Sequence, residues 1–304
     1  MKYFSLFSGI GGLEYGLQNS DNQCVGFSEI KRSSIEIYKR HFSGVKNYGD
    51  ITKININELP DFDILLGGFP CQSFSLAGGR KGFKDRRGKM IFYVYDILKA
   101  KRPKHFVLEN VKGLINHDRG KTYKSVFKLL MFAGYNVRCV LLNSSYYGST
   151  QNRERIFFLG SRDNFDIKIP EIVDDTKRFR DIREKNGNFR FIDKNEKTIN
   201  KIEQKKKFSF ELIGGYDRVG TLTTQYGCGE KLVWEKDWFR YLTVKECERL
   251  QGFPDDWTKG ISDNQRYWQL GNAVNCNVSK YLFNSYLPEV WKDFKKELKP
   301  LYKG

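Results

Sequence analysis

The sequence predicts an α/β protein built on a doubly wound, mixed but mostly parallel sheet, with a smaller loop-rich domain. In the first half of the 304 residues, short apolar runs typical of buried strands alternate with segments of helical spacing. After about Asn164 this alternation stops, and a polar stretch of mixed charge follows. The hydrophobic content of 39% is enough for one sizeable core and a second small domain.

The elements follow in chain order from these patterns. The expected strands of the first half are Lys2–Phe7, Cys24–Glu29, Phe62–Leu66, His105–Leu108 and Arg155–Gly160. The expected helices, with apolar side chains at helical spacing, are Gly12–Gln18, Lys31–Phe42, Gly88–Ala100 and Lys121–Phe132. Later helices are expected at Thr243–Gln251, where Thr243 is the N-cap and Glu246 its capping-box partner, and at Asn277–Leu287. Short β-like runs at 213–216, 220–224 and 226–229 indicate a separate loop-rich module.

The charge balance points to a polyanionic partner. The chain carries 53 Lys and Arg against 36 Asp and Glu, a formal net charge of +17. This surplus favours DNA or RNA as the partner, and a merely soluble basic enzyme is the alternative. No apolar run approaches the roughly 20 residues of a membrane span, and the N-terminus does not resemble a secretory signal. We therefore expect a soluble, cytoplasmic protein.

Cysteine and histidine spacing predicts neither a disulfide framework nor a metal site. The 6 cysteines form no CxxC pair, and the 3 histidines do not lie at zinc-ligand spacing. We expect no metal, and small buried or inert thiols at every cysteine except Cys71.

A glycine-rich turn and two carboxylates predict a cofactor site. The turn Phe7–Gly12 joins the first strand to its helix, where glycines let a ligand approach the backbone closely. Glu29 ends the next strand, where a carboxylate can accept both hydroxyls of a ribose. Asp50 is a candidate contact for the edge of an adenine. The pattern fits a nucleotide or S-adenosylmethionine, and the alternative is a tight turn with a surface acid.

Cys71 is the candidate nucleophile. It follows Pro70 at the predicted carboxyl end of a strand, the edge at which α/β proteins bind ligands. A thiol is a strong nucleophile only as the thiolate, which positive potential favours. The nearby basic residues are Arg80, Lys81, Lys84, Arg86, Arg87 and Lys89. The alternative is an inert cysteine.

Two more segments place charged side chains at strand ends. Glu109 could protonate or hydrogen-bond a ring nitrogen of a base, and otherwise is an ordinary exposed acid. Arg153 and Arg155, within Gln151–Arg155, could hold Glu109 or grip a carbonyl oxygen, and otherwise are solvated.

Together and in this order, these segments resemble those of the DNA (cytosine-5) methyltransferases of prokaryotic restriction–modification systems. The resemblance spans nearly the whole chain and implies a Rossmann-like, S-adenosylmethionine-dependent methyltransferase fold. It rests on segments 7–12, 68–75, 109–111, 151–155 and 269–274. The Pro-Cys-Gln element of the second segment and the Glu-Asn-Val of the third are the most specific.

The resemblance implies covalent methylation of carbon 5 of a cytosine. The base is swung out of double-stranded DNA, because carbon 5 cannot be reached inside the stack. Cys71 would add to carbon 6, and Glu109 would protonate or hydrogen-bond ring nitrogen 3. Arg155 would hold oxygen 2, and Arg153 would brace the Glu109 segment.

The implied methyl donor is S-adenosylmethionine, with S-adenosylhomocysteine as product. Its implied contacts are Phe7, Gly9, Gly11, Glu29, Ile30, Asp50, Ile51, Pro70 and Asn272. Phe7 and the glycines would line the methionine end, Ile30 would pack on the adenine, and Asn272 would close the site. One departure is Lys31, which stands where the family often has an acid.

The implied domains are a catalytic and cofactor-binding domain at 1–169, a target recognition domain at 170–237, and a C-terminal segment at 238–304 that returns to the catalytic domain. The implied DNA contacts are Gln72, Ser73, Arg86, Arg87, Arg218, Thr221, Thr223, Gln225 and Tyr226. Residues 73–89 resemble the family's mobile catalytic loop, and a flexible surface loop is the alternative. The family implies a monomer acting on nucleoid DNA, functionally paired with a restriction endonuclease.

Competing functions remain open at this point. An RNA-methylating relative would share the fold, although a distinct basic recognition module favours DNA. A catalytically inactive DNA-binding relative would lack some of the implied catalytic residues, and all of them are present. A nicotinamide-dependent dehydrogenase fits the first strand–helix unit but leaves Pro70-Cys71 and Glu109 without a role.

Overall fold

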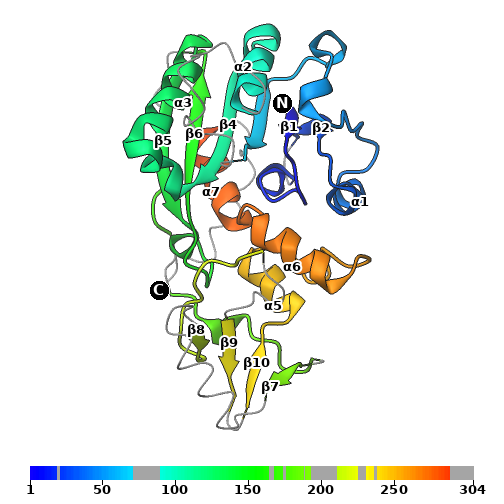
Figure 1. Ribbon diagram of the computed structural model, residues 1–304, viewed down its shortest axis with the longest axis vertical. Helices are drawn as coiled ribbons and strands as arrows, with labels where there is room; N and C mark the ends of the chain where they lie inside the picture. Colours follow the sequence, from blue (N-terminus) through cyan, green and yellow to red (C-terminus); the bar gives the residue numbers. More distant parts are fainter. Residues whose placement is uncertain are drawn as a thin grey trace. The chain divides into compact units, whose positions relative to one another are not determined.

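The computed structural model describes residues 1–18, 21–70, 90–163, 168–173, 176–187, 189–192, 211–224, 231–235 and 238–287. The chain divides into two compact units (Figure 1). The first consists of Met1–Leu142, Glu154–Pro170 and Ser279–Gly304, and the second of Asn143–Arg153 and Glu171–Val278. Several predicted site residues lie outside the described residues: Cys71, Gln72, Ser73, Arg86, Arg87, Gln225 and Tyr226.

A six-stranded sheet forms the centre of the first unit, with strand order β2-β1-β3-β4-β6-β5. The strands are β1 (Lys2–Leu6), β2 (Gln23–Ser28), β3 (Ile64–Gly68), β4 (His105–Val111), β5 (Asn136–Asn143) and β6 (Glu154–Ser161). The pairs β1–β2, β1–β3 and β3–β4 are parallel, and β4–β6 is antiparallel. The predicted fold class, a mixed and mostly parallel α/β sheet, is confirmed.

Helices bury the apolar faces of this sheet. They are α1 (Arg32–His41), α2 (Met90–Lys101), α3 (Lys121–Phe132) and α7 (Cys276–Tyr286). Val94 of α2 and Leu130 of α3 share one core cluster with Leu65 and Phe106 of the sheet. The α7 helix is tied to the same unit, because Ser279 Oγ donates to the carbonyl of Gly12 at 2.9 Å. No helix among the described residues is both long and apolar enough to cross a membrane.

Short 3₁₀ helices complete the connections of both units. They are η1 (Glu14–Leu17), η2 (Ile51–Lys53), η3 (Ile56–Glu58), η6 (Lys112–Ile115), η7 (His117–Gly120), η8 (Ser144–Tyr146) and η9 (Phe179–Asp181). The predicted helix at 12–18 is therefore wrong in type and extent. Gly12 and Gly16 weaken an α-helix there, and a Cβ on Gly16 would lie 2.6 Å from the Ser279 carbonyl carbon.

The second unit holds a four-stranded sheet of order β7-β10-β9-β8. Its strands are short: β7 (Phe191–Ile192), β8 (Glu211–Ile213), β9 (Lys231–Trp234) and β10 (Phe239–Tyr241). The β10–β7 and β10–β9 pairs are antiparallel, whereas β8–β9 is parallel. Two helices follow, α5 (Val244–Leu250) and α6 (Asp263–Asn272).

Buried ion pairs hold this second unit together. Arg240 is fully buried, and its Nη2 and Nε lie 2.8 Å from Glu246 and 2.7 Å from Glu235. Glu246 also completes the predicted capping box with Thr243 at the start of α5, which is confirmed. Buried Glu248 accepts a hydrogen bond from the amide of Thr258 and lies 3.2 Å from Arg266. Buried ion pairs thus accompany the apolar core of the second unit, which includes Leu232, Leu250 and Leu270.

The predictions fail in specific places. Residues 220–224 form no strand; the backbone of Val219 bonds to Thr150 and Asn152, and the amide of Leu222 donates to the Gln151 side chain. Strand β5 and helix α6 were not expected. The compact units place Asn143–Arg153 and the helices α5 and α6 within the second unit. The predicted division into catalytic domain, target recognition domain and C-terminal segment stays a prediction.

Candidate active site

The turn after β1 leaves room for a ligand. Phe7, Gly9 and Gly11 have positive φ angles of 53°, 56° and 87°. A Cβ on Gly9 would have no atom within 4 Å, whereas one on Gly11 would lie 2.4 Å from the Phe42 ring. Gly11 is therefore required for packing, and Gly9 opens onto free space. Buried Ser8 Oγ lies beside this turn and has no hydrogen-bond partner within the described part of the chain.

Glu29 is held rigidly at the carboxyl end of β2. Its Oε2 accepts from the amide of Gly9 at 2.9 Å, and its Oε1 accepts from the amides of Ile30 and Lys31, both at 2.8 Å. A carboxylate offers about four acceptor positions, so one remains for an outside hydroxyl. Asn47 fixes the backbone of Glu29 from both sides, through bonds of 3.2 Å to its amide and 3.0 Å to its carbonyl.

Three other predicted cofactor contacts, Ile30, Asp50 and Ile51, differ in how far they are open to a ligand. Ile30 is 73% exposed, an unusual state for an aliphatic side chain, and offers an apolar surface. Asp50 Oδ1 accepts from the amide and the hydroxyl of Thr52, both at 2.9 Å. Ile51 is buried in the core, so only its backbone is available to a ligand. The carboxylate, the open turn and the exposed Ile30 together fit a nucleoside.

The remaining two predicted cofactor contacts are placed differently. Pro70 is exposed directly after Phe69. Asn272 belongs to the second unit, at the end of α6, where its Nδ2 donates to the carbonyl of Trp268 at 2.9 Å.

A second set of side chains lies at the carboxyl ends of β3 and β4. Glu109 is opposite Gly68 in the parallel register, and a Cβ on Gly68 would lie 3.2 Å from Glu109 Oε2. Arg155 Nε lies 3.0 Å from Glu109 Oε1, with 16% and 13% of the two side chains exposed. The short distance and low exposure make this an oriented, partly desolvated pair.

Asn110 is a positioning residue that sequence reasoning missed. It is buried, and its Nδ2 donates to the carbonyl of Phe69 at 2.8 Å, two residues before Cys71. Its Oδ1 accepts from the amide of Val111 at 2.9 Å. Asn110 therefore fixes the backbone that leads into Pro70-Cys71, beside Glu109. Its position within the Glu109-Asn110-Val111 segment was the sequence feature that could have identified it.

Arg153 is placed by the structure in the second unit. It is buried there, where Nη1 donates to the carbonyl of Leu222 at 3.2 Å and Nη2 to those of Gly271 and Ala273 at 2.8 Å. Its predicted role of bracing the Glu109 segment stays a prediction, and an ion pair to Glu109 is made by Arg155. The three carbonyls come from two distant segments, so Arg153 joins residue 222 to the end of α6.

Two of the predicted recognition residues, Thr221 and Thr223, lie along this joined region. Thr221 Oγ1 donates to the carbonyl of Asn152 at 2.7 Å, and the amide of Leu222 donates to Gln151 Oε1 at 3.0 Å. Gly271 is needed here, since a Cβ would lie 2.2 Å from the carbonyl oxygen of Thr223. The neighbouring Arg218 is half-buried. The structure thus brings together segments 151–153, 221–223 and 269–273, which the sequence identified separately.

A buried acid lies directly after the glycine turn. Glu14 is 1% exposed and accepts a short hydrogen bond from Ser5. Burial raises the pKa of Glu14 to about 7. Tyr38 lies near it and is 3.5 Å from Cys24 Sγ. Among the described residues, no group of three or more His, Cys, Asp or Glu could hold a metal ion.

Solved structures define the class of this fold. The S. pombe Dnmt2 methyltransferase matches with a TM-score of 0.77 at 21% identity, covering 100% of both chains. The Entamoeba histolytica methyltransferase EhMeth matches with a TM-score of 0.77, covering 96% of this chain and 99% of that one. The architecture is that of a methyltransferase.

Sequence relatives narrow the class to a family. Type II methyltransferase M1.ScrFI of Lactococcus lactis subsp. cremoris is 38% identical, over 90% of this chain and 74% of that protein. Type II methyltransferase M.NgoBI of Neisseria gonorrhoeae is 37% identical, over 91% and 90%. Orphan methyltransferase M.SPRI of Bacillus phage SPR is 44% identical, over 66% and 46%.

The model of the C-5 cytosine-specific DNA methylases matches residues 1–211 and 182–287, and the chain belongs to this family. The predicted family and enzyme class, a DNA (cytosine-5) methyltransferase of the prokaryotic restriction–modification type, are confirmed.

Proposed function

We propose that the protein methylates carbon 5 of a cytosine flipped out of a specific double-stranded DNA sequence, through a transient bond between Cys71 and carbon 6. The observation that carries this proposal is the Glu109–Arg155 pair beside Gly68, with Asn110 holding the backbone two residues before Cys71. A nucleophile and an oriented acid are thereby supplied by neighbouring strand ends.

The chain's own residues account for the activation of the base. Cytosine carbon 5 is a poor nucleophile. When the Cys71 thiolate forms a bond to carbon 6, the electron pair of the ring double bond moves toward carbon 5, and Glu109 stabilises the ring by a proton or hydrogen bond at nitrogen 3. Once carbon 5 has bonded to the methyl group that S-adenosylmethionine would supply, loss of the carbon 5 proton to a base, a water in our proposal, re-forms the ring double bond and expels Cys71 as the thiolate.

Arg155 has two roles in this proposal. Its bond to Glu109 orients the carboxyl group toward the base. The same guanidinium is proposed to hold oxygen 2 of the cytosine.

S-adenosylmethionine is the proposed donor and supplies a reactive sulfonium methyl group when bound. Glu29 has one acceptor position left for a ribose hydroxyl, Ile30 offers a surface for the adenine, and the open turn at Gly9 takes the methionine end. Phe7, Gly11, Asp50, the backbone of Ile51, Pro70 and Asn272 complete the proposed contacts.

DNA is the proposed macromolecular partner, and the net charge of +17 supports it. The proposed contacts are Gln72, Ser73, Arg86 and Arg87 around the catalytic cysteine, and Arg218, Thr221, Thr223, Gln225 and Tyr226 in the second unit. The relatives include Type II methyltransferases and an orphan phage enzyme. We propose a monomeric modification enzyme acting on nucleoid DNA in the cytoplasm, with a restriction endonuclease as its functional counterpart.

Bisulfite sequencing of DNA from cells that express the protein tests this function. We expect methylated cytosine at carbon 5 within one recurring sequence, and none in cells that express Cys71→Ser. That variant should still bind DNA, because it loses only the nucleophile. Wild-type methylation by Cys71→Ser would remove Cys71 from the reaction.

A mechanism-based trap separates an active enzyme from one that only binds. DNA that carries 5-fluorocytosine at the methylated position cannot lose its carbon 5 substituent as a proton. It should therefore remain bonded to the wild-type protein and not to Cys71→Ser. A labelled-methyl transfer assay on RNA serves as the comparison, and transfer to RNA alone would overturn DNA as the substrate.

A further inference from the structure

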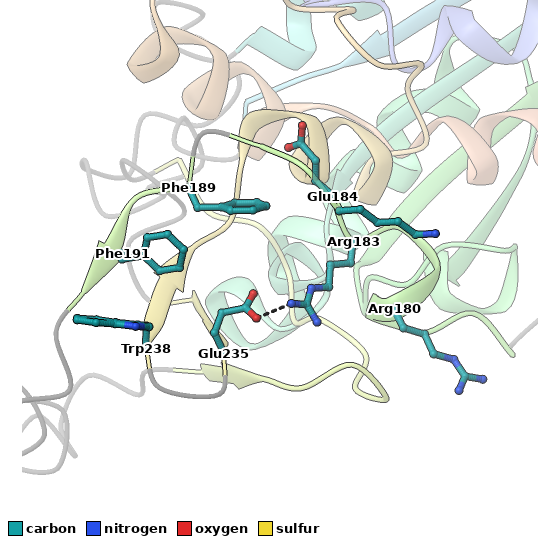
Figure 2. A pocket seen from close by; sticks show the side chains of 8 residues that line it. Arg180, Arg183, Glu184, Phe189, Phe191, Glu235 and Trp238 are labelled. Carbon is teal, nitrogen blue, oxygen red and sulfur yellow. Dashed lines mark hydrogen bonds and ion pairs between the residues drawn. The ribbon is translucent and has the colours of Figure 1, made fainter.

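The second unit contains a pocket that none of the predicted site residues lines. Its volume is about 570 Å³, within the roughly 300–1,000 Å³ of typical ligand sites. Figure 2 shows Phe189, Phe191 and Trp238 on one side, with Arg180 and Arg183 on the other. Lys185 also lines the pocket. All of these residues belong to the second unit.

The three aromatic rings form a continuous wall. Phe189 and Phe191 meet edge to face at 6.0 Å between ring centroids, and Phe191 and Trp238 at 6.4 Å. Phe191 is 52% exposed and Trp238 46%, so about half of each residue is open to solvent. Phe189 is fixed from below by buried Arg240, whose guanidinium carbon lies 4.4 Å from the ring centroid. Adjacent exposed aromatic side chains held in this way mark a binding surface.

The opposite side of the pocket is basic. The Arg180 side chain is 56% exposed and that of Arg183 is 42% exposed. The two acids of the lining are engaged within the protein. Glu235 pairs with Arg183 and with Arg240, and Glu184 Oε2 accepts from the hydroxyl of Thr243 at 2.8 Å. Arg180 lies 3.8 Å from Asp181 and its guanidinium carbon 4.5 Å from the centroid of the Tyr216 ring. The lining therefore carries a small positive excess, with Arg180, Arg183 and Lys185 against Glu184 and Glu235.

The sequence around the pocket is also rich in both aromatic and basic residues. Basic residues alternate with Phe179, Phe189 and Phe191 along the segment 176–191. They are Lys177, Arg178, Arg180, Arg183, Lys185 and Arg190, against the acids Asp181 and Glu184. Aromatic platforms among basic side chains are the arrangement that holds single-stranded nucleic acid, because each base has a face that stacks and each phosphate a charge that pairs.

We propose that this pocket binds one unstacked nucleotide of the DNA substrate, with its base on Phe191 and Trp238 and its phosphate at Arg180 and Lys185. The inference rests on the proposed function for the identity of the partner. It goes beyond that function, because this nucleotide is a different one from the cytosine that is methylated. An acidic peptide would meet the cations equally well but would leave the exposed ring faces uncovered.

Binding of a fluorescent oligothymidylate to the full-length protein tests the proposal. This probe contains no cytosine, so its binding does not depend on the base that is methylated. We expect Trp238→Leu to weaken binding about tenfold, through loss of base stacking. Arg180→Gln should lower the slope of log affinity against log salt concentration by about 0.7, the contribution of one phosphate contact in a single strand.

Trp234→Leu is the matched control. Trp234 is 53% exposed on the neighbouring strand β9 and does not line the pocket, so its replacement should leave the affinity unchanged. Equal losses in the two variants, or wild-type binding by Trp238→Leu, would overturn the proposal. Phe191→Leu should weaken probe binding in the same way. It replaces Trp238→Leu as the test if that variant does not fold.

Two further measurements separate the possible failures. A polyglutamate peptide that displaces the probe from the wild type as readily as unlabelled oligothymidylate does would show a general polyanion site and overturn the nucleotide. Methylation of cytosine-containing duplex DNA is followed in parallel. If the wild type methylates DNA but Trp238→Leu binds the probe normally, this inference alone is wrong. If the wild type does not methylate DNA but Trp238→Leu binds the probe more weakly, the proposed function alone is wrong.

Discussion

The two units hold their functional segments by different means. In the first, Glu29 and Glu109 stand at the ends of strands in an apolar sheet, and backbone amides, Asn47 and Asn110 orient their surroundings. In the second, strands are short. The buried guanidinium group of Arg153 joins segments that are distant in the chain, and that of Arg240 pairs with the nearby Glu235 and Glu246. Removing one partner of a buried ion pair leaves an uncompensated charge, so the second unit depends on these contacts.

The largest expected effect tests the strand-end site of the first unit. Glu109→Gln should lower kcat about 10²- to 10⁴-fold, because the amide cannot supply a proton to the base. Folding should be retained, since the amide oxygen still accepts from Arg155. Single-turnover methyl transfer and thermal unfolding measure the two properties.

Glu154→Gln is the control for this experiment. Glu154 pairs with Lys112 at 2.7 Å, and both side chains are half-exposed, so the variant should keep near wild-type activity. A fully active Glu109→Gln protein would remove Glu109 from the chemistry.

The next effect concerns the buried charges of the second unit. Glu246→Gln should lower the free energy of unfolding by about 3–5 kcal/mol, because Arg240 stays buried with only part of its pairing. Urea unfolding followed by tryptophan fluorescence reports on this unit, which contains Trp234, Trp238, Trp257 and Trp268. Asp255→Asn, which breaks the more exposed pair with Arg249, should cost no more than about 1 kcal/mol. Equal losses of unfolding free energy in the two variants would contradict the expected difference between buried and exposed ion pairs.

Glu14, the buried acid that follows the glycine turn, should make the stability of the protein depend on pH. The pKa of Glu14 is raised from 4.5 to about 7, mainly by burial. Between these values the folded protein keeps a proton that the unfolded chain has lost, so stability falls as the pH rises from 4.5 to 7. The loss is on the order of 3 kcal/mol and is complete above pH 7.

Glu14→Gln should remove this contribution. The variant should be more stable than the wild type above pH 7, and the difference should shrink as the pH falls toward 4.5. Urea unfolding at several pH values provides the comparison. Parallel pH profiles for the two proteins would mean that Glu14 does not titrate in this range.

The smallest expected effects are those of replacing two glycines, one from each unit, by alanine. Gly271→Ala should lower the free energy of unfolding by about 1–3 kcal/mol, because its Cβ would collide with the Thr223 backbone. Gly9→Ala meets open space, so its cost should be only the roughly 1–2 kcal/mol of a positive φ angle. Gly9→Ala should instead weaken binding of S-adenosylmethionine, measured by calorimetry. A Gly271→Ala protein stabilised by its better helix propensity would contradict the close approach.

Most of the first unit could be predicted from the sequence. Apolar runs place β1, β2, β3, β4 and β6, because a strand buried in a mostly parallel sheet is apolar along its length. Strand β5 was missed because its apolar run, Cys139–Leu142, is short and its residues alternate between exposed and more buried positions. Helix α6 was missed because it is mostly polar, although Ser262 and Gln265 form a capping box that could have marked its start.

The buried charges could not be predicted. Arg153 and Arg240 look like surface residues in the sequence, since their burial depends on acceptors that the fold arranges around each guanidinium group. Arg153 was expected to brace the Glu109 segment and Arg155 to hold oxygen 2 of the cytosine. The two arginines belong to different compact units, which their closeness in the sequence does not indicate. The pocket beside Trp238 is likewise assembled from residues about 50 positions apart in the chain.

Gln151 and Arg153 grip residue 222 by its amide and carbonyl, not by its side chain. The hydroxyl of Thr221 adds a further bond to this anchor, and the Leu222 side chain is buried. An exchange of this loop between enzymes should therefore keep residues 221 and 222 together with a glycine at position 271.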